Sequence, residues 1–483
     1  MKKHLFSIIV FIVLIQSCAS IDDLKISKSI LSKIDAEKMV KFSFKEDYKM
    51  LGHNFEPWQT TNFTVNGEFW INKNTFLKQD TLINNRGQKY TSKTAYNNEI
   101  LLFLDYGDAE LLPLTTDLYF EKIINTARYS PIFVLNYFIK KEIDTKIVTL
   151  KENIIYSLKI GKYLTKLSIN KKTNLVDKIS YLSYDELYGD VTTSYIYSEY
   201  VTDEFLTYPT SIEIENINGK IVENVTVLAT EIISDDFKLL EKPEDYKLTE
   251  RKEESKPEIK VTKYNENIHF IDLIHTDDRV MIVEIDDFVL VAEAPINSKN
   301  GELIIAEVKK IAPLKPIKYF VFGHHHPHYL GGLRAFVYQD ATILCTDISK
   351  NYVEYIANAP HTISPDNLQL NPKKIKTQII LDSLVLGKNK EMKIYFMGEK
   401  SAHTKDYLIY YFPKDKLLFQ DDLCWIPREG PITKARNRQV GLYNIIKELN
   451  LEVDTIIQSW PVTNHKLKTI FPFTDLEESV LME

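Results

Sequence analysis

The sequence has few cysteines and few glycines, and it has no excess of positive charge. Only 3 of its 483 residues are Cys and 15 are Gly. So few cysteines leave one disulfide arithmetically possible, between Cys345 and Cys424, but nothing in their spacing calls for it. So few glycines exclude collagen-like and linker-like chains. The formal net charge is −7, with 60 Lys and Arg against 67 Asp and Glu. Because proteins that bind nucleic acid in general carry a basic face, no nucleic-acid partner is expected.

The rest of the composition is that of a folded protein with more than one domain. Hydrophobic residues make up 44% of the chain and charged residues 26%, an ordinary balance for a globular protein. At roughly 100–200 residues per domain, the length predicts two or three domains. The chain contains 28 Tyr and 24 Phe. Aromatic residues are favoured in strands, so we expect a strand-rich protein.

The first residues indicate export. A basic start is followed by an apolar run at residues 5–15, the pattern of a signal peptide, and the run is shorter than the roughly 20 residues of a membrane span. Residues 14–18, Leu-Ile-Gln-Ser-Cys, resemble a bacterial lipobox. The resemblance implies that residues 1–18 are a signal peptide and that Cys18 is lipidated. It also implies a bacterial cell-envelope protein, an outer-membrane lipoprotein facing the periplasm or the cell surface and attached to the membrane by its lipid anchor. An ordinary secreted protein cut near Ser20 is the alternative.

Residues 22–240 are predicted to form a β-rich, mostly antiparallel N-terminal domain. Asn218-Gly219 between two β-prone runs predicts a hairpin, and a helical stretch at 116–141 is broken by Pro131. Residues 241–260 are rich in Lys, Glu and Pro and are predicted to be a charged linker. The meander around a helical insert is similar to the half-barrel of periplasmic lipoprotein carriers, which implies a carrier of hydrophobic molecules; a structural or docking domain is equally open.

Residues 261–483 show a different pattern, in which strands and helices alternate. Strands are predicted at 268–273, 280–285, 288–292 and 317–322, and helices at 303–311 and 440–449. Mixed strands and helices in this order predict an α/β sandwich with a site at the strand ends.

Four of the eleven histidines lie between residues 324 and 328. Burial alone rarely requires so many imidazoles, because each ring carries nitrogens that need partners. A metal ion does require them, and residues i and i+2 leaving a strand converge on one ion. Successive side chains face opposite sides, so His325 is expected to point away from His324 and His326. A solvated loop that binds metal adventitiously is the alternative interpretation.

Three ordered motifs resemble the metallo-β-lactamase-fold hydrolases. In that family a strand leads into His-x-His-x-Asp-His, one further residue, and Gly-Gly opening a helix; here residues 323–332 read Gly-His-His-His-Pro-His-Tyr-Leu-Gly-Gly. Residues 398–404 resemble the loop with the third histidine, His403, and residues 417–423 resemble the strand that ends in a bridging aspartate, Asp422. The resemblance covers about residues 260–480. It implies an αβ/βα sandwich and a Zn²⁺ ion held by His324, His326 and His403.

The sequence departs from this family at the second metal position. His328 stands where the family has Asp, and Tyr329 stands where it has His. The final Gly-His-Gly turn is absent, because the corresponding stretch contains Trp460 and no histidine before His465. We therefore expect one well-held zinc ion and a weak or absent second site made of His328 and Asp422.

These features together predict an envelope-anchored, zinc-dependent hydrolase. Metal-bound hydroxide is expected to attack a small-molecule ester, lactone, amide or phosphodiester, a choice that the fold alone does not make. Asp422 is predicted to position the ion and the water, and His328 to assist proton transfer. The alternatives are a catalytically inactive metal- or ligand-binding lipoprotein with the same fold, and the hydrophobic-molecule carrier acting through the N-terminal domain.

Overall fold

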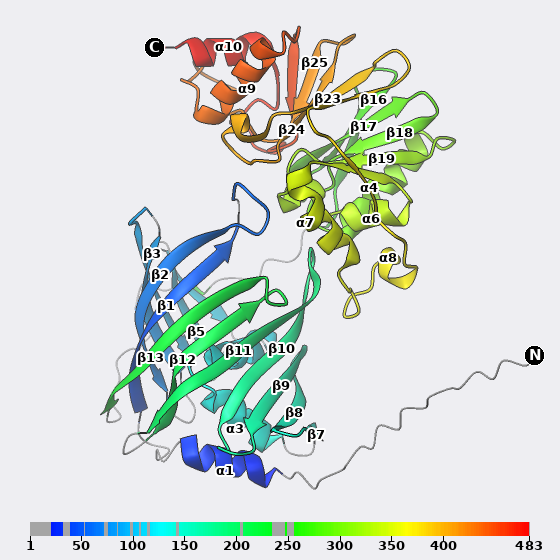
Figure 1. Ribbon diagram of the computed structural model, residues 1–483. Helices are drawn as coiled ribbons and strands as arrows, with labels where there is room; N and C mark the ends of the chain where they lie inside the picture. The colour runs from blue at the N-terminus through cyan, green and yellow to red at the C-terminus, as the bar shows by residue number, and fades with distance from the viewer. Residues whose placement is uncertain are drawn as a thin grey trace, which may run out of the picture. The chain divides into compact units, whose positions relative to one another are not determined.

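The computed structural model describes most of the chain after its first twenty residues (Figure 1). The described residues are 21–31, 39–52, 54–71, 76–84, 86–96, 100–105, 108–113, 116–141, 144–202, 206–233, 247–248 and 256–482. The predicted signal peptide, Cys18 and most of the predicted linker at 241–260 lie outside these ranges. Among the described helices, none is both long enough and apolar enough to span a membrane.

The chain divides into two compact units. The first contains residues 1–48, 63–183 and 192–250, and the second contains residues 49–62, 184–191 and 251–483. The chain therefore contributes two short segments, 49–62 and 184–191, to the second unit before its main part begins. Both segments carry residues of the site described below.

The first unit is built on one sheet of fourteen strands, in the order β14-β6-β5-β4-β3-β2-β1-β13-β12-β11-β10-β9-β8-β7. Pairs such as β1–β13, β3–β4 and β11–β12 are antiparallel, whereas β14 pairs with β6 in parallel. The strands are β1 (Met39–Leu51), β2 (Thr60–Ile71), β3 (Phe76–Asn84), β4 (Lys89–Tyr96), β5 (Ile100–Asp105), β6 (Asp108–Pro113), β7 (Lys146–Thr149), β8 (Asn153–Ile160), β9 (Tyr163–Asn170), β10 (Val176–Asp185), β11 (Gly189–Thr202), β12 (Thr207–Asn216), β13 (Ile221–Ile233) and β14 (Lys247–Leu248). Both β1 and β11 extend from the first unit into the second.

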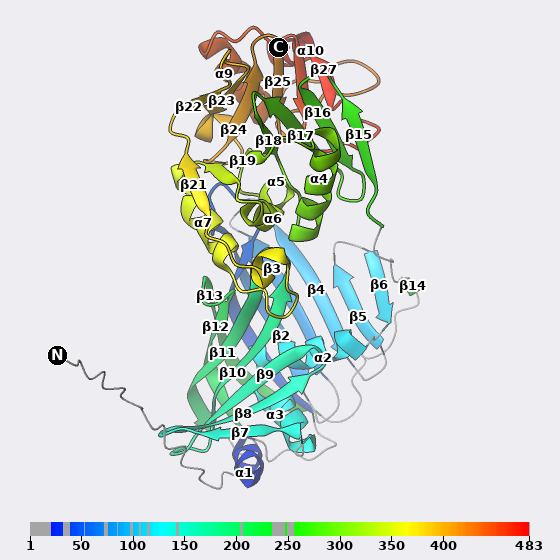
Figure 2. The same cartoon turned by 90° about the vertical axis from the view of Figure 1, so that its right-hand side faces the viewer.

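Alternating side chains give this sheet one apolar face. In β8 and β9 every second residue is buried, which is the pattern of a strand with one face in the core. The sheet curves around helical segments (Figures 1 and 2), which are α1 (Asp22–Leu31), α2 (Thr116–Asn125), the 3₁₀ turn η1 (Thr126–Arg128) and α3 (Ile132–Lys140). Leu24 of α1 and Phe138 of α3 share one hydrophobic core with Ile212 and Val227 of the sheet.

Two local predictions for this unit are confirmed, the break at Pro131 and the turn at Asn218-Gly219. Pro131 caps α3 and separates it from η1, so the predicted helical stretch is interrupted where proline removes a backbone donor. Asn218 and Gly219 both have positive φ, in the turn that joins β12 to β13.

The second unit contains two mixed sheets. The first has the order β15-β16-β17-β18-β19-β20-β21 and the second β22-β23-β24-β25-β26-β27. Their strands are β15 (Ile259–Lys263), β16 (Ile268–Leu273), β17 (Asp278–Ile285), β18 (Phe288–Ala292), β19 (Ile317–Val321), β20 (Thr342–Cys345), β21 (Lys376–Ile379), β22 (Ser383–Leu386), β23 (Met392–Phe396), β24 (Leu408–Phe412), β25 (Leu417–Gln420), β26 (Thr455–Gln458) and β27 (Ile470–Pro472). The helical elements are α4 (Ser298–Ile311), α5 (Pro327–Leu330), α6 (Leu333–Tyr338), α7 (Asp347–Asn358), α8 (Asn367–Leu370), the 3₁₀ turn η4 (Gly398–Ser401), α9 (Asn437–Glu448) and α10 (Phe473–Leu481).

The two sheets share a core, and helices cover their outer faces. Met281 and Leu290 of the first sheet pack in one cluster with Ile394 and Phe419 of the second. A further cluster joins the second sheet to α9 and α10, whereas α4, α6 and α7 lie on the side of the first sheet (Figure 1). The predicted fold class is confirmed: a large, mostly antiparallel β region precedes an α/β sandwich of the αβ/βα type.

Candidate metal centre

The histidine-rich segment follows strand β19, whose last two residues are buried. Pro327 occupies the first position of α5, and the backbone of His326 is extended, so the chain turns sharply directly after the third consecutive histidine. Two glycines then allow close packing. A Cβ added at Gly331 would lie 2.3 Å from the Ile296 carbonyl carbon, and one added at Gly332 would lie 2.8 Å from the Ala294 Cβ. The Gly-Gly pair is therefore explained by close approach to the preceding loop.

Three predicted ligands meet at one point. His324, His326 and His403 are all buried, and one ring nitrogen from each lies within 4.8 Å of the others. His324 Nε2 and His326 Nδ1 are 3.0 Å apart. The segment after β19 and the loop after η4, which are nearly 80 residues apart in sequence, thus supply one cluster.

The other ring nitrogens of two histidines have acceptors. His324 Nδ1 lies 2.7 Å from Asp421 Oδ2, and His326 Nε2 lies 3.2 Å from the Asn54 carbonyl oxygen. In the tautomers that donate to these two acceptors, His324 Nε2 and His326 Nδ1 both present lone pairs to the cluster, 3.0 Å apart, and a cation would satisfy both. The proton positions are thus those that metal ligation requires.

His403 supplies the third nitrogen from a tight turn. Ala402 has φ +51°, and Ser401 Oγ accepts hydrogen bonds from the backbone N–H groups of His403 and Thr404, each at 3.1 Å. His403 Nε2 lies 3.0 Å from Asp422 Oδ2 but is not aligned for a hydrogen bond, and it is a buried nitrogen without a hydrogen-bond partner among the described residues. A buried ring nitrogen without a bond is costly unless a ligand satisfies it, so these residues fit a metal ion that prefers imidazole.

Burial also sets the protonation of His324. Burial, followed by the neighbouring imidazoles, holds the pKa of His324 well below its usual value. A neutral imidazole is the form that binds a metal ion. His324 is therefore in the form that binds an ion near neutral pH.

A buried acidic pair lies behind His324. Tyr410 donates a hydrogen bond of 2.8 Å to Glu293 Oε1, and the Gly323 N–H donates to the same carboxylate. Burial raises the pKa of Glu293 to about 8, and burial together with the Glu293 charge raises the pKa of Asp421 well above its usual range. The absence of a side chain at Gly323 makes room for Asp421, because a Cβ there would lie 2.1 Å from Asp421 Oδ2.

The remaining predicted residues lie in three different places. Asp422 adjoins the cluster through His403. His328 is partly exposed, and its Nδ1 lies 3.0 Å from Oδ1 of the fully buried Asp278. Although burial opposes it, the hydrogen bond and charge of Asp278 raise the pKa of His328. His325 points to a separate partner, with its Nδ1 2.9 Å from Asp406 Oδ1. His465 is exposed and is not a member of the three-histidine group.

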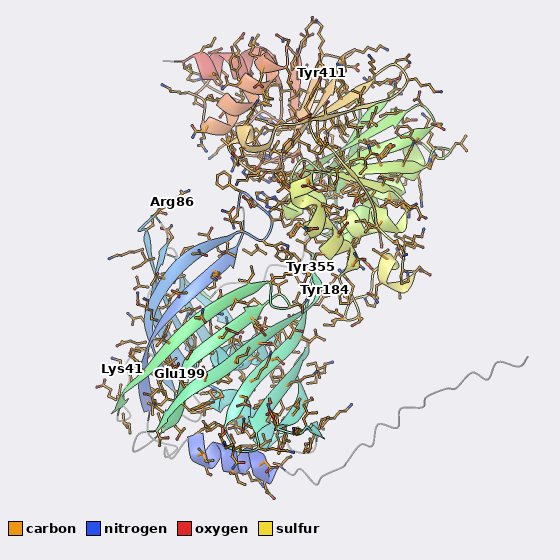
Figure 3. All side chains as sticks on the ribbon, in the orientation of Figure 1. Lys41, Arg86, Tyr184, Glu199, Tyr355 and Tyr411 are labelled. Carbon is orange, nitrogen blue, oxygen red and sulfur yellow. The ribbon has the colours of Figure 1, made fainter. Side chains whose placement is uncertain are left out.

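Segment 49–62 is a part of the site that the sequence did not indicate. Its Asn54 carbonyl accepts the His326 hydrogen bond, and its Phe55 carbonyl accepts one of 2.8 Å from the Lys405 N–H. Trp58 anchors the segment among tyrosines. Its ring centre lies 5.3 Å from that of Tyr188 and 5.0 Å from that of Tyr355, a residue of α7. Tyr355 is labelled in Figure 3. These contacts involve backbone carbonyls and aromatic rings that are far apart in the sequence. They therefore produce no sequence motif by which the segment could have been recognised.

Comparison with known proteins gives matches to solved structures alone. No protein-family description and no curated protein matches the chain. Among solved structures, a metallo-beta-lactamase from Pontibacter korlensis is 15% identical over 46% of this chain and 97% of its own, with a TM-score of 0.34. The DIM-1 metallo-beta-lactamase is 17% identical over 46% of this chain and 95% of its own, with a TM-score of 0.34. The FIM-1 enzyme from Pseudomonas aeruginosa, in a mono-zinc form, is 18% identical over 47% and 95%, with a TM-score of 0.34. The chemistry proposed below therefore rests on the residues of the site.

Proposed function

We propose that the second unit is a zinc-dependent hydrolase of small molecules. The observation that carries this proposal is the convergence of ring nitrogens from His324, His326 and His403, of which His403 Nε2 is buried without a bond among the described residues. Three imidazole ligands leave one tetrahedral position open, which is typical of a catalytic zinc site and not of a structural one.

The chain's own residues would orient the ion and move protons. Zinc at such a site lowers the pKa of a water molecule to about 7 and polarises a carbonyl or phosphoryl oxygen. Asp421 holds the proton on His324 Nδ1, and the Asn54 carbonyl holds the proton on His326 Nε2. Asp422, beside His403, would accept a proton from the attacking water. His328, with its Nδ1 fixed by Asp278, keeps its other nitrogen for proton transfer to a leaving group.

The metal content of the purified protein tests this proposal. A tag-free chain that starts after Cys18 should contain about one zinc ion per chain by mass spectrometry, and the His324→Ala/His326→Ala double variant should contain none. His465→Ala is the matched control, because it removes an exposed histidine outside the cluster and should keep the ion. If the wild type contains no metal even after incubation with zinc, the proposal is wrong.

Turnover separates a hydrolase from a metal-binding protein. The zinc-loaded wild type and His403→Ala should be compared on ester, lactone, amide and phosphodiester substrates. Activity that disappears in the variant supports a hydrolase. Zinc binding with no activity on any substrate class would favour the inactive metal-binding lipoprotein instead.

We also propose that the protein is anchored in a bacterial cell envelope through Cys18. The support is the lipobox-like sequence at residues 14–18 after the apolar run. Mass spectrometry of the mature N-terminus should find an acylated Cys18, and Cys18→Ala should release the protein from the membrane fraction. A mature N-terminus near Ser20 would instead indicate ordinary secretion.

A further inference from the structure

Asp422 is shared between the histidine cluster and a guanidinium group. Its Oδ2 lies 3.0 Å from His403 Nε2 and also 3.1 Å from Arg438 Nη1. The same Arg438 nitrogen lies 3.4 Å from the Asp422 backbone oxygen. Since one oxygen lies close to both groups, the guanidinium nitrogen and the His403 nitrogen are at most about 6 Å apart. A positively charged side chain therefore lies directly beside the histidine cluster.

Arg438 is held in place but retains donors. Its guanidinium lies over the Trp425 ring, 5.2 Å from the ring centre, and Arg436 lies at the same distance from that ring. Within the described part of the chain, only Nη1 of Arg438 makes hydrogen bonds, so Nε and Nη2 remain for another partner. The side chain is 29% exposed, and a small molecule can therefore reach it.

The surrounding segment is basic although the whole chain is acidic. Residues 425–438 contain one acidic residue, Glu429, and four basic ones, which are Arg428, Lys434, Arg436 and Arg438. The net charge of the chain is −7. A local cluster of one sign raises the concentration of oppositely charged ligands near it. The segment that carries Arg438 thus favours an anion.

The position of Arg438 also bears on whether a second metal ion could bind at Asp422. A second metal ion at Asp422 would have to share Oδ2 with a guanidinium that already occupies it, and two neighbouring cations repel each other. Arg438 therefore supplies at Asp422 the positive charge that a second ion would otherwise supply.

We propose that Arg438 is a specificity-determining residue that binds an oxyanion of the substrate, a phosphate or a carboxylate, beside a single metal ion. This inference rests on the proposed hydrolase function and narrows its substrates to anionic ones. A planar guanidinium with free donors matches the geometry of carboxylate and phosphate oxygens. The metal ion and Arg438 then hold two ends of one substrate, with Asp422 between them.

The test measures anion binding and metal content separately on the chain that starts after Cys18. Inorganic phosphate and acetate are titrated by calorimetry into the wild type, Arg438→Ala and Arg428→Ala, each with and without zinc. Arg428 is the matched control, because it carries the same charge in the same segment and its hydrogen bonds go to the Leu467 carbonyl. We expect Arg438→Ala to weaken phosphate or acetate binding at least tenfold and Arg428→Ala to change it less than twofold.

The anion whose affinity falls in Arg438→Ala identifies the oxyanion that Arg438 binds. Weakened phosphate binding alone indicates a phosphate ester, weakened acetate binding alone a carboxylate, and either supports the role of Arg438. Unchanged binding of both anions, or an equal loss in Arg428→Ala, overturns that role. Two zinc ions per wild-type chain overturn the single-ion claim. If the wild type binds no zinc, the hydrolase proposal fails, while the zinc-free titrations still decide whether Arg438 binds the anion.

Discussion

Gly323 determines how closely the Asp421 carboxylate can approach His324. Its missing Cβ leaves space for Asp421, whose carboxylate is fully buried and has no alternative position in solvent. Gly323→Ala should push Asp421 away from His324 Nδ1 and remove the acceptor that fixes the ring. Loss of such a partner typically lowers metal affinity about 10–100-fold, which a zinc competition titration measures. Gly52→Ala is the control, since its Cβ would meet only the Met50 side chain at 3.9 Å. Equal affinities in both variants would contradict this role.

His361 links the stability of the second unit to pH. The ring is fully buried, and burial, reinforced by the Arg334 charge, lowers its pKa to about 4, although Asp366 and Asp190 oppose the shift. Between this pKa and the usual 6.5, the unfolded state binds the proton and the folded state does not. The free energy of unfolding should therefore fall as the pH drops from 6.5 to 4. At pH 5 the loss should be at most about 2 kcal/mol. The free energy of unfolding in urea should be measured at pH 7 and pH 5, with metal removed by a chelator. Between these pH values it should fall less in His361→Gln than in the wild type. An equal fall in both proteins would refute the assignment to His361.

Segment 49–62 should control metal affinity through its anchor. Trp58 holds the segment against three tyrosine rings, and the segment places the Asn54 carbonyl at His326 Nε2. Trp58→Ala removes the anchor and not the acceptor, so zinc affinity should fall severalfold, less than for Gly323→Ala. Hydrogen exchange at residues 49–62 should rise in the same variant. Phe55→Ala is the control, because that side chain is half exposed. A variant of Trp58 with wild-type affinity would show that the segment does not support the cluster.

Elements with strong local signals were predictable, and contacts between distant elements were not. Strands β16 and β18 have the predicted bounds, because each is a short, buried run made mostly of apolar residues. His324 and His326 were predictable because their spacing is itself the signal, whereas His403 was expected from the resemblance of residues 398–404 to a known family. Asn54 acts through a backbone carbonyl, which no residue type encodes. Arg438 and Asp278 lie far in sequence from the groups they contact, and only the tertiary fold brings them there.

The two units have separate hydrophobic cores, and the ion would belong to one of them. The first core lies between the fourteen-stranded sheet and its helices, whereas the second lies between the two mixed sheets that frame the histidine cluster. A ligand that binds only the folded form stabilises the unit that binds it, by about 2.7 kcal/mol at a hundred times its dissociation constant. Calorimetry should therefore show two thermal transitions, and chelation of zinc should lower only one of them by several degrees. In the His324→Ala/His326→Ala variant, chelator should change neither transition. An equal shift of both transitions would mean that the units unfold together, and the metal ion would then stabilise the whole chain.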